Sequence, residues 1–286
     1  MLGHTLFSEL LSSEKYNVYA TVRNRSTLSD CFSPSLLNKV IGGVNVDNFD
    51  TVIRAVSFVK PNVVINCIGL IKQLPEASDP LTAISVNSLL PHRISLLCRT
   101  AGARMIHFST DCVFNGKKGS YRESDLADGD DLYGRTKLMG EVSGADCLTL
   151  RTSIIGHELR GCNGLVQWFL AQKGTIRGFE NVIYSGFPTV EIARIVGDYV
   201  LPKADLNGIY HVSSQPISKH ELLKLVAVRY NKADIEIEPY DEPRLDRSLD
   251  SSAFHQLVNY YPPSWPELVD RMYAHYISSP CYRRYS

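Results

Sequence analysis

The sequence predicts an α/β fold built on a doubly wound parallel sheet. Three short runs rich in β-branched and apolar residues read as strands, at 17–22 (NVYATV), 62–67 (NVVINC) and 104–109 (RMIHFS). Between them, apolar residues recur at helical spacing, as they do over 49–59. Strands that alternate with helices form right-handed βαβ units, which place the strands side by side and parallel.

Later segments continue this alternation. A long helix is predicted over 81–101 with an interruption near Pro91, then a helix over 133–142 and a strand over 147–152. After about residue 155 the alternation loosens and glycines become frequent, although helices are still expected at 189–200 and 218–230. Open α/β sheets bind their ligands at the carboxyl ends of the strands, and we expect the second half to pack there.

We therefore predict two interleaved domains, a sheet domain over 1–155 and a smaller lobe over 156–286. The 286 residues are 44% hydrophobic, as in ordinary globular proteins. The 30 Lys and Arg residues balance the 30 Asp and Glu residues, which argues against binding to nucleic acid or to an anionic membrane through bulk charge. The sequence leaves a homodimer open.

The compartment is predicted from what the chain does not contain. No run approaches the roughly 18 apolar residues of a membrane-spanning helix, and the first residues lack the features of a signal peptide. The seven cysteines form neither a CxxC pair nor a metal-binding pattern with histidine. Scattered cysteines of this kind are typical of reducing compartments, so we expect a cytoplasmic protein without a metal site.

Candidate catalytic residues lie around one helix. Tyr133 and Lys137 are four residues apart and share a helix face, where a nearby ammonium would lower the phenol's pKa from its usual value near ~10. Thr110 ends the preceding strand at the ligand-binding edge of the sheet, while Cys67 and Gly69 follow an earlier strand. A glycine there lets a ligand approach the backbone. Taken alone, each feature also fits an ordinary helix, cap or turn.

Three segments together resemble a known family. STDCVF (109–114), YGRTKLMGE (133–141) and LRTSIIG (150–156) follow one another as in the extended short-chain dehydrogenase/reductases, and most closely as in their dTDP-4-dehydrorhamnose reductase branch. The resemblance runs from Met1 to about Ser252. It implies a Rossmann domain that binds a nicotinamide dinucleotide, with Thr110, Tyr133 and Lys137 as the catalytic group. Tyr133 would donate a proton to a keto oxygen, Thr110 would orient that oxygen, and Lys137 would hold the nicotinamide ribose.

Cofactor choice is predicted from the turn after the second strand. In such folds an acidic residue there selects a free ribose hydroxyl, whereas an arginine accommodates the 2′-phosphate. The chain has Arg23 followed by Asn24 and Arg25, so we predict NADP, with NAD left open. The resemblance also places Asp47 at the adenine and Asn87 near the cofactor.

The glycine-rich loop that cradles the pyrophosphate is incomplete. Of the pattern GxxGxxG, only the last glycine has a counterpart, Gly3. The first strand and the two earlier glycines are missing, so both neighbours of that central strand would have unpaired edges. We expect that the native start lies upstream of Met1; the alternative is a short form whose cofactor loop is damaged.

On the substrate side, the resemblance implies reduction of a nucleotide-linked 4-keto-6-deoxy sugar for cell-surface polysaccharide or O-antigen synthesis. Arg247 is predicted to pair with the nucleotide diphosphate, unless it belongs to a salt-bridged turn, and Val113 and Phe114 to line the sugar pocket. A nucleotide-sugar epimerase and a regulatory subunit without catalysis remain as alternatives. A dehydratase would need a glutamate where the chain has Cys112.

Overall fold

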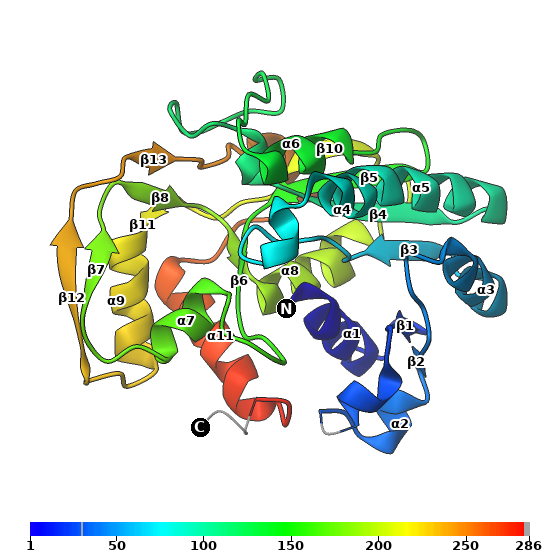
Figure 1. Ribbon diagram of the computed structural model, residues 1–286, viewed down its shortest axis with the longest axis horizontal. Helices are drawn as coiled ribbons and strands as arrows, with labels where there is room; N and C mark the ends of the chain where they lie inside the picture. The colour runs from blue at the N-terminus through cyan, green and yellow to red at the C-terminus, as the bar shows by residue number, and fades with distance from the viewer. Residues whose placement is uncertain (30, 283–286) are drawn as a thin grey trace.

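A four-stranded parallel sheet forms the centre of the computed structural model, which describes residues 1–29 and 31–282 (Figure 1). The strand order is β10-β5-β4-β3. These strands are Gly208–His211, Cys147–Thr152, Arg104–Thr110 and Val63–Asn66. Every residue of β5, and every residue of β4 after Arg104, is buried, as expected for a parallel sheet covered on both faces.

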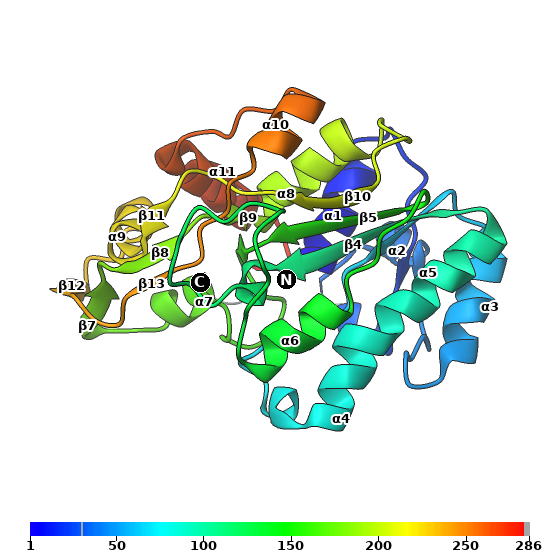
Figure 2. The same cartoon turned by 90° about the horizontal axis from the view of Figure 1, so that it is seen from above.

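Helices cover the two faces of this sheet (Figure 2). On one face lie α3, α5 and α6, which are Phe49–Val59, Leu90–Ala101 and Leu132–Met139. On the other face lie α1 and α8, which are Leu2–Ser12 and Thr189–Ile195. Side chains alternate along the strands accordingly: Met105 packs in the α5 cluster, whereas Ile106 packs in the α1 and α8 cluster.

The parallel strands of the first half are divided between two separate sheets, as expected from the missing first strand. β1 (Ala20–Thr21) and β2 (Val40–Ile41) form their own two-stranded parallel sheet, and β3 is the last strand of the main sheet. The expected strand over 17–22 is thus only two residues long. Helix α1 connects the two parts, because Leu6 packs in the main core and Phe7 packs with residues of the β1–β2 unit.

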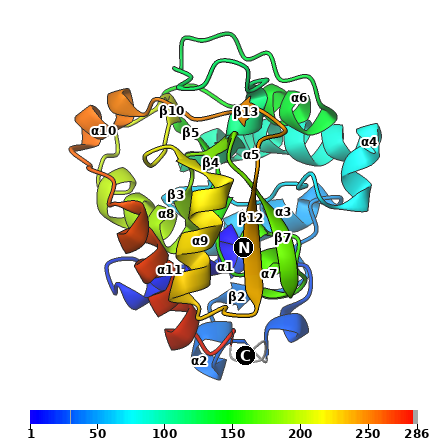
Figure 3. The same ribbon diagram turned by 90° about the vertical axis from the view of Figure 1, so that its left-hand side faces the viewer.

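The second half builds a lobe beside the carboxyl ends of the strands, seen end-on in Figure 3. Its paired strands are β6 (Ile154–Ile155) with β9 (Phe187–Pro188), β7 (Gly174–Phe179) with β12 (Ile235–Tyr240), and β8 (Val182–Tyr184) between β11 (Ile217–Ser218) and β13 (Leu245–Asp246). Its helices are α7 (Leu165–Leu170), α9 (Lys219–Arg229), α10 (Ser252–Val258) and α11 (Trp265–Ser278). The same half also supplies β10 to the main sheet and α8 to one of its faces.

Short helices and turns complete the chain. These are η1 (Arg25–Leu28), α2 (Pro34–Leu37), η2 (Pro75–Ser78), α4 (Pro80–Ala83), η3 (Ile84–Leu89), η4 (Asp111–Val113) and η5 (Val196–Val200). The long helix predicted over 81–101 is the succession α4–η3–α5, with Pro91 in the first turn of α5. Within the two described ranges, no helix combines the length and apolar character that a membrane span requires.

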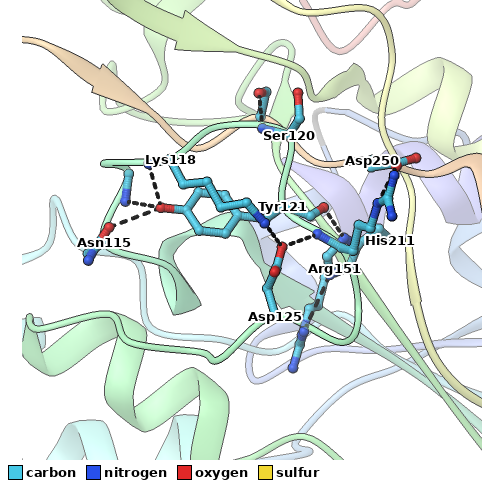
Figure 4. A network of polar contacts seen from close by, with 11 residues as sticks. Asn115, Lys118, Ser120, Tyr121, Asp125, Arg151, His211 and Asp250 are labelled. Atoms are coloured by element: carbon cyan, nitrogen blue, oxygen red, sulfur yellow. Dashed lines mark hydrogen bonds and ion pairs between the residues drawn. The ribbon is translucent and has the colours of Figure 1, made fainter.

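A polar network holds the loop between β4 and α6 against the sheet (Figure 4). The Tyr121 hydroxyl accepts hydrogen bonds from the backbone amides of Gly116 and Lys118, each at 3.1 Å. The Tyr121 carbonyl accepts a bond of 2.9 Å from Nδ1 of His211 in β10, and Nε2 of that ring accepts one of 3.3 Å from Arg151 in β5. The loop that follows β4 is therefore tied to β5 and β10.

Arg151 also forms a buried ion pair. Its guanidinium donates two bonds of 2.8 Å to the Glu141 carboxylate, and the two side chains are only 7% and 4% exposed. Ser109 donates a further bond of 2.6 Å to the same carboxylate. Since Ser109 directly precedes Thr110, this pair supports the end of β4.

Replacing Arg151 with methionine should therefore destabilise the protein strongly. The change leaves the Glu141 carboxylate buried without its cation, which typically costs about 3–5 kcal/mol in the free energy of unfolding. The matched control is Arg122→Met, since Arg122 pairs with Asp250 at 3.2 Å while its own side chain is 71% exposed; its cost should stay below about 1 kcal/mol. Urea unfolding measures both, and equal costs would contradict the role given to burial.

Candidate active site

Thr110 and Tyr133 meet at the carboxyl end of β4. The Thr110 hydroxyl accepts a bond of 3.2 Å from the Cys112 amide and donates one of 3.1 Å to the Asp111 carboxyl, so it caps η4. The phenol of Tyr133, in α6, lies near the Thr110 side chain, which acts on the pKa of the phenol. The structure thus brings two of the three predicted catalytic residues close together.

The position of α6 is set by its first turn. The Asp131 carboxylate caps the helix by accepting a bond of 2.7 Å from the Gly134 amide, and it pairs with Lys72 at 2.8 Å. Gly134 lies directly against the Cys112 carbonyl, where a Cβ atom would overlap the oxygen. Only glycine allows α6 to approach η4 this closely, and this approach places Tyr133 beside Thr110.

Lys137 lies one turn further along α6 and is 5% exposed. Its ammonium donates a bond of 2.7 Å to the Phe108 carbonyl. A Cβ atom at Gly69 would stand 3.8 Å from the Lys137 Nζ and 3.7 Å from the Asn87 Oδ1. Asn87 is held in place because its Oδ1 accepts a bond of 2.8 Å from the Leu70 amide. The structure therefore gathers Gly69, Asn87 and Lys137 at one point beside the Thr110–Tyr133 pair.

The predicted lowering of the Tyr133 pKa is wrong. Burial raises the pKa of this phenol, with a further contribution from Cys112, while the nearby Thr110 side chain opposes the rise. Lys137 does not offset this effect because its ammonium bonds to the Phe108 carbonyl. Burial also lowers the pKa of Lys137 to about 8. The Tyr133 phenol therefore keeps its proton at neutral pH, as a proton donor must.

Gly3 and Cys67 lie together where α1 begins. A Cβ atom at Gly3 would be 3.4 Å from the Cβ of Cys67, and burial raises the pKa of the Cys67 thiol to about 12. Met1 is the N-cap residue of α1, and its side chain makes no cap hydrogen bond. This end of α1 thus faces the residue that follows β3, where helix N-termini bind phosphate groups in such folds.

Arg23 and Asp47 follow β1 and β2, and both are exposed. The Arg23 carbonyl accepts a bond of 3.1 Å from the Gly43 amide, which fixes the turn. They belong to the separate two-stranded sheet, so a dinucleotide that contacts both Arg23 and Lys137 would extend across the gap between the sheets. In the cluster of Gly69, Asn87 and Lys137, an ammonium stands beside backbone left open by a glycine, an arrangement suited to a ligand hydroxyl.

Val113 and Phe114 are not where the sequence predicts them, and this expectation is wrong. Both are 0% exposed and belong to a small core with Tyr121 and Leu249. The Phe114 ring stacks on Tyr121 with centroids 4.2 Å apart, so it fills the space under the loop instead of lining a sugar pocket.

Arg247, by contrast, lies over η4. Its Nε donates a bond of 2.8 Å to the Phe114 carbonyl, and its Nη1 is 3.6 Å from the Cys112 sulfur. The described residues do not form the alternative, a turn in which Arg247 pairs with a nearby aspartate. Asp250 pairs with Arg122, and an Asp246 oxygen accepts a hydrogen bond from the Ser248 amide. Sequence analysis did not identify Lys219, a neighbour of Arg247 at the start of α9, because Lys219 lies in no local motif.

The lowered pKa of Lys137 predicts how the free energy of unfolding depends on pH. In the unfolded chain this amine keeps its ordinary pKa of 10.5, whereas in the folded protein it is about 8. Between these values only the unfolded chain holds the proton, so the wild-type free energy of unfolding should rise with pH relative to that of Lys137→Met, by about 1.4 kcal/mol per unit. Below pH 8 the difference should be constant. Chemical unfolding from pH 7 to 10.5 measures it, and parallel curves would contradict the prediction.

Two curated proteins are similar in sequence to part of this chain. The "Probable low-salt glycan biosynthesis reductase Agl14" of Haloferax volcanii is 29% identical over 184 residues, which are 60% of this chain and 60% of that protein. The "Methionine adenosyltransferase 2 subunit beta" of Danio rerio is 27% identical over 214 residues, 69% of this chain and 65% of that protein. The matched region thus spans less than two thirds of either relative.

A solved structure has the same fold. The dTDP-4-dehydrorhamnose reductase from Bacillus anthracis, determined in complex with NADP, superposes with a TM-score of 0.73 at 19% identity, over 91% of this chain and 99% of that one. The family model described as "RmlD substrate binding domain" matches residues 1–277. Both findings agree with the resemblance predicted from the sequence, and the chain belongs to the RmlD substrate binding domain family.

Proposed function

We propose that this protein is an NADPH-dependent reductase of a nucleotide-linked 4-keto-6-deoxy sugar that serves cell-surface polysaccharide synthesis. The observation that carries the proposal is the gathering of Lys137, Gly69 and Asn87 at the end of β4, with a protonated Tyr133 phenol near Thr110. The names of the Haloferax volcanii and Bacillus anthracis relatives point to the same chemistry.

In this proposal each residue has a separate task. The bound nicotinamide supplies a hydride to the carbonyl carbon. Tyr133 gives its phenolic proton to the carbonyl oxygen, so that the ketone becomes an alcohol. Thr110 donates a hydrogen bond that orients this oxygen, and solvent returns the proton to the phenolate. Lys137 binds the ribose hydroxyls through its ammonium, while Asn87 keeps the adjoining loop in place.

The cofactor and the compartment are part of the same proposal. Arg23 stands exposed after β1 without a carboxylate in that turn, which favours the 2′-phosphate of NADP, with NAD as the second choice. The seven cysteines are free thiols, as expected in the reducing cytoplasm.

A regulatory role without catalysis is the main alternative. The likeness to the Danio rerio methionine adenosyltransferase subunit favours it. A nucleotide-sugar epimerase would use the same tyrosine and lysine with NAD held tightly, and Arg23 argues against it.

Replacing Tyr133 with phenylalanine tests the proposed reduction. Incubation with NADPH and a panel of nucleotide-linked 4-keto sugars should consume NADPH in the wild type, and the variant should lose about 10²–10⁴-fold in rate because its proton donor is gone. The control is Tyr261→Phe, since Tyr261 is 81% exposed and should leave the rate unchanged. Loss of absorbance from the reduced nicotinamide measures the rate.

Equal rates for the wild type and Tyr133→Phe would remove the proposed proton donor. A wild type that binds NADPH but turns over no keto sugar would instead favour the regulatory alternative.

Arg23→Ala tests the choice of cofactor. Removing the guanidinium should weaken NADPH binding by about tenfold, as expected for a lost charge-assisted contact, and leave NADH binding nearly unchanged. Fluorescence titration with each dinucleotide measures both affinities. A parallel loss for the two cofactors would contradict the assignment of Arg23 to the 2′-phosphate.

A further inference from the structure

Two free cysteines from distant parts of the sequence lie side by side in the fold. The Cys281 thiol donates a hydrogen bond of 2.9 Å to the Cys31 carbonyl, across a separation of 250 residues. Because a carbonyl oxygen lies about 2.4 Å from its own Cα atom, the Cys281 sulfur is within about 5.3 Å of the Cα atom of Cys31. Both side chains pack in the cluster that contains Phe7, Phe32 and Val40.

The turn that carries Cys281 is held in place by the next residue. Tyr282 is 1% exposed, and its hydroxyl shares a hydrogen bond of 2.5 Å with Nε2 of His4 in α1. The Tyr282 ring also packs edge-on against the His4 ring, with centroids 5.8 Å apart. The folded protein therefore keeps the Cys281 sulfur beside Cys31.

The two thiols differ in how easily a solute reaches them. Cys31 is half-buried, whereas Cys281 is 5% exposed. Burial raises the pKa of the Cys281 thiol to about 11, and the neighbouring Cys31 thiol adds to the rise. A dissolved oxidant should thus react first with Cys31, and the oxidised sulfur would find a second thiol next to it. Redox-sensing cysteines have this arrangement, an accessible thiol beside a resolving one.

The other cysteines provide internal comparisons. Cys98 and Cys147 share a different core cluster, and both are buried. Because burial protects a thiol from dissolved oxidants, this pair should stay reduced while Cys31 reacts. Cys162 is exposed, so it reports how fast a thiol reacts when it is freely accessible.

A bond between Cys31 and Cys281 would cross the boundary between two parts of the fold. Cys31 lies in the connection between β1 and β2, which form a sheet of their own; among the described strands, neither pairs with the main sheet. Side-chain packing attaches this unit to the rest, as where Phe32 meets Phe7 of α1 with ring centroids 5.7 Å apart. Cys281 follows α11, which packs on α8 and α9 in the second half of the chain.

We propose that Cys31 and Cys281 are a redox-sensitive pair that hydrogen peroxide converts into a disulfide, which clamps the β1–β2 unit to the end of α11. The Cys31 thiolate attacks one peroxide oxygen, the O–O bond breaks, and Cys31 sulfenic acid and one water form. The Cys281 sulfur then displaces the hydroxyl group from the sulfenic sulfur, which gives the S–S bond and a second water. The two thiols lose two electrons and two protons, and the peroxide is reduced.

This pair goes beyond the proposed reductase function and does not depend on it. The disulfide would close a loop of about 250 residues, and a long loop restricts the unfolded chain strongly. We therefore expect the oxidised protein to melt about 5 °C or more above the reduced protein. Deuterium uptake over 20–41 should also slow by about tenfold, because local opening of the β1–β2 unit is hindered.

Peptide mapping of the full chain under non-reducing conditions tests the proposal. After treatment with hydrogen peroxide, the wild type should yield a linked Cys31–Cys281 peptide and an intact mass lower by about 2 Da, and dithiothreitol should reverse both changes. Cys31→Ser should give neither the link nor the rise in Tm. Cys162→Ser is the control and should behave as the wild type does, since this exposed thiol is not part of the pair.

Several results would overturn the assignment. Cys31 recovered only as a sulfinic acid, or linked to Cys162, would show that Cys281 does not resolve it. A Cys98–Cys147 link that forms first would contradict the role given to exposure. A Cys31–Cys281 link that changes neither the Tm nor deuterium uptake over 20–41 would remove the clamp. Oxidised and reduced wild type are compared with each other, so the stability of a variant does not affect these outcomes.

Discussion

The close approach of α6 to the turn after β4 is the constraint on which the whole site depends. Gly134 rests on the Cys112 carbonyl, and Lys137 is bonded to the Phe108 carbonyl one turn later. These two contacts hold the helix across the end of the strand and fix the distance between Tyr133 and Thr110. Any side chain at position 134 would push the helix away and separate the phenol from the Thr110 hydroxyl.

Burial in this packed arrangement determines the chemistry of the two titratable residues. In water, a lysine near a tyrosine would promote the phenolate, and the sequence spacing alone suggests that effect. Inside the protein the cost of removing each charge from water is larger, so the phenol holds its proton more tightly and the amine releases its own more easily. At neutral pH the Tyr133 phenol is therefore protonated, which is the state that a proton donor needs.

Periodicity was sufficient to predict most of the sheet and helices. The helix over 49–59 has the predicted bounds, and the strand predicted over 104–109 extends by one residue to Thr110. Such elements are marked by apolar side chains that face one core. The strand over 17–22 shrank to Ala20–Thr21 because it pairs with a neighbour on one side only. Strand length depends on partners that a local pattern does not contain.

The site was predicted less completely, for reasons of the same kind. Strand-end positions and the family resemblance indicated Thr110, Tyr133, Lys137 and the Gly69–Asn87 pair. They also suggested Val113 and Phe114, whose apolar side chains fit a pocket and a core equally well; only packing against Tyr121 decides between them. Lys219 is more than a hundred residues from Thr110 in sequence, and the fold alone brings its charge to Asp111.

The origin of β10 in the second half of the chain has a consequence for synthesis on the ribosome. β4 and β5 emerge early, but the outer edge of β5 pairs only with Gly208–His211, and α1 is covered by α8 from the same late segment. At roughly 5–20 residues per second, the nascent chain carries an open apolar sheet edge for several seconds before its partner arrives. The main sheet therefore stays incomplete until the second half of the chain has been made, and chaperone binding during elongation would protect its open edge from aggregation.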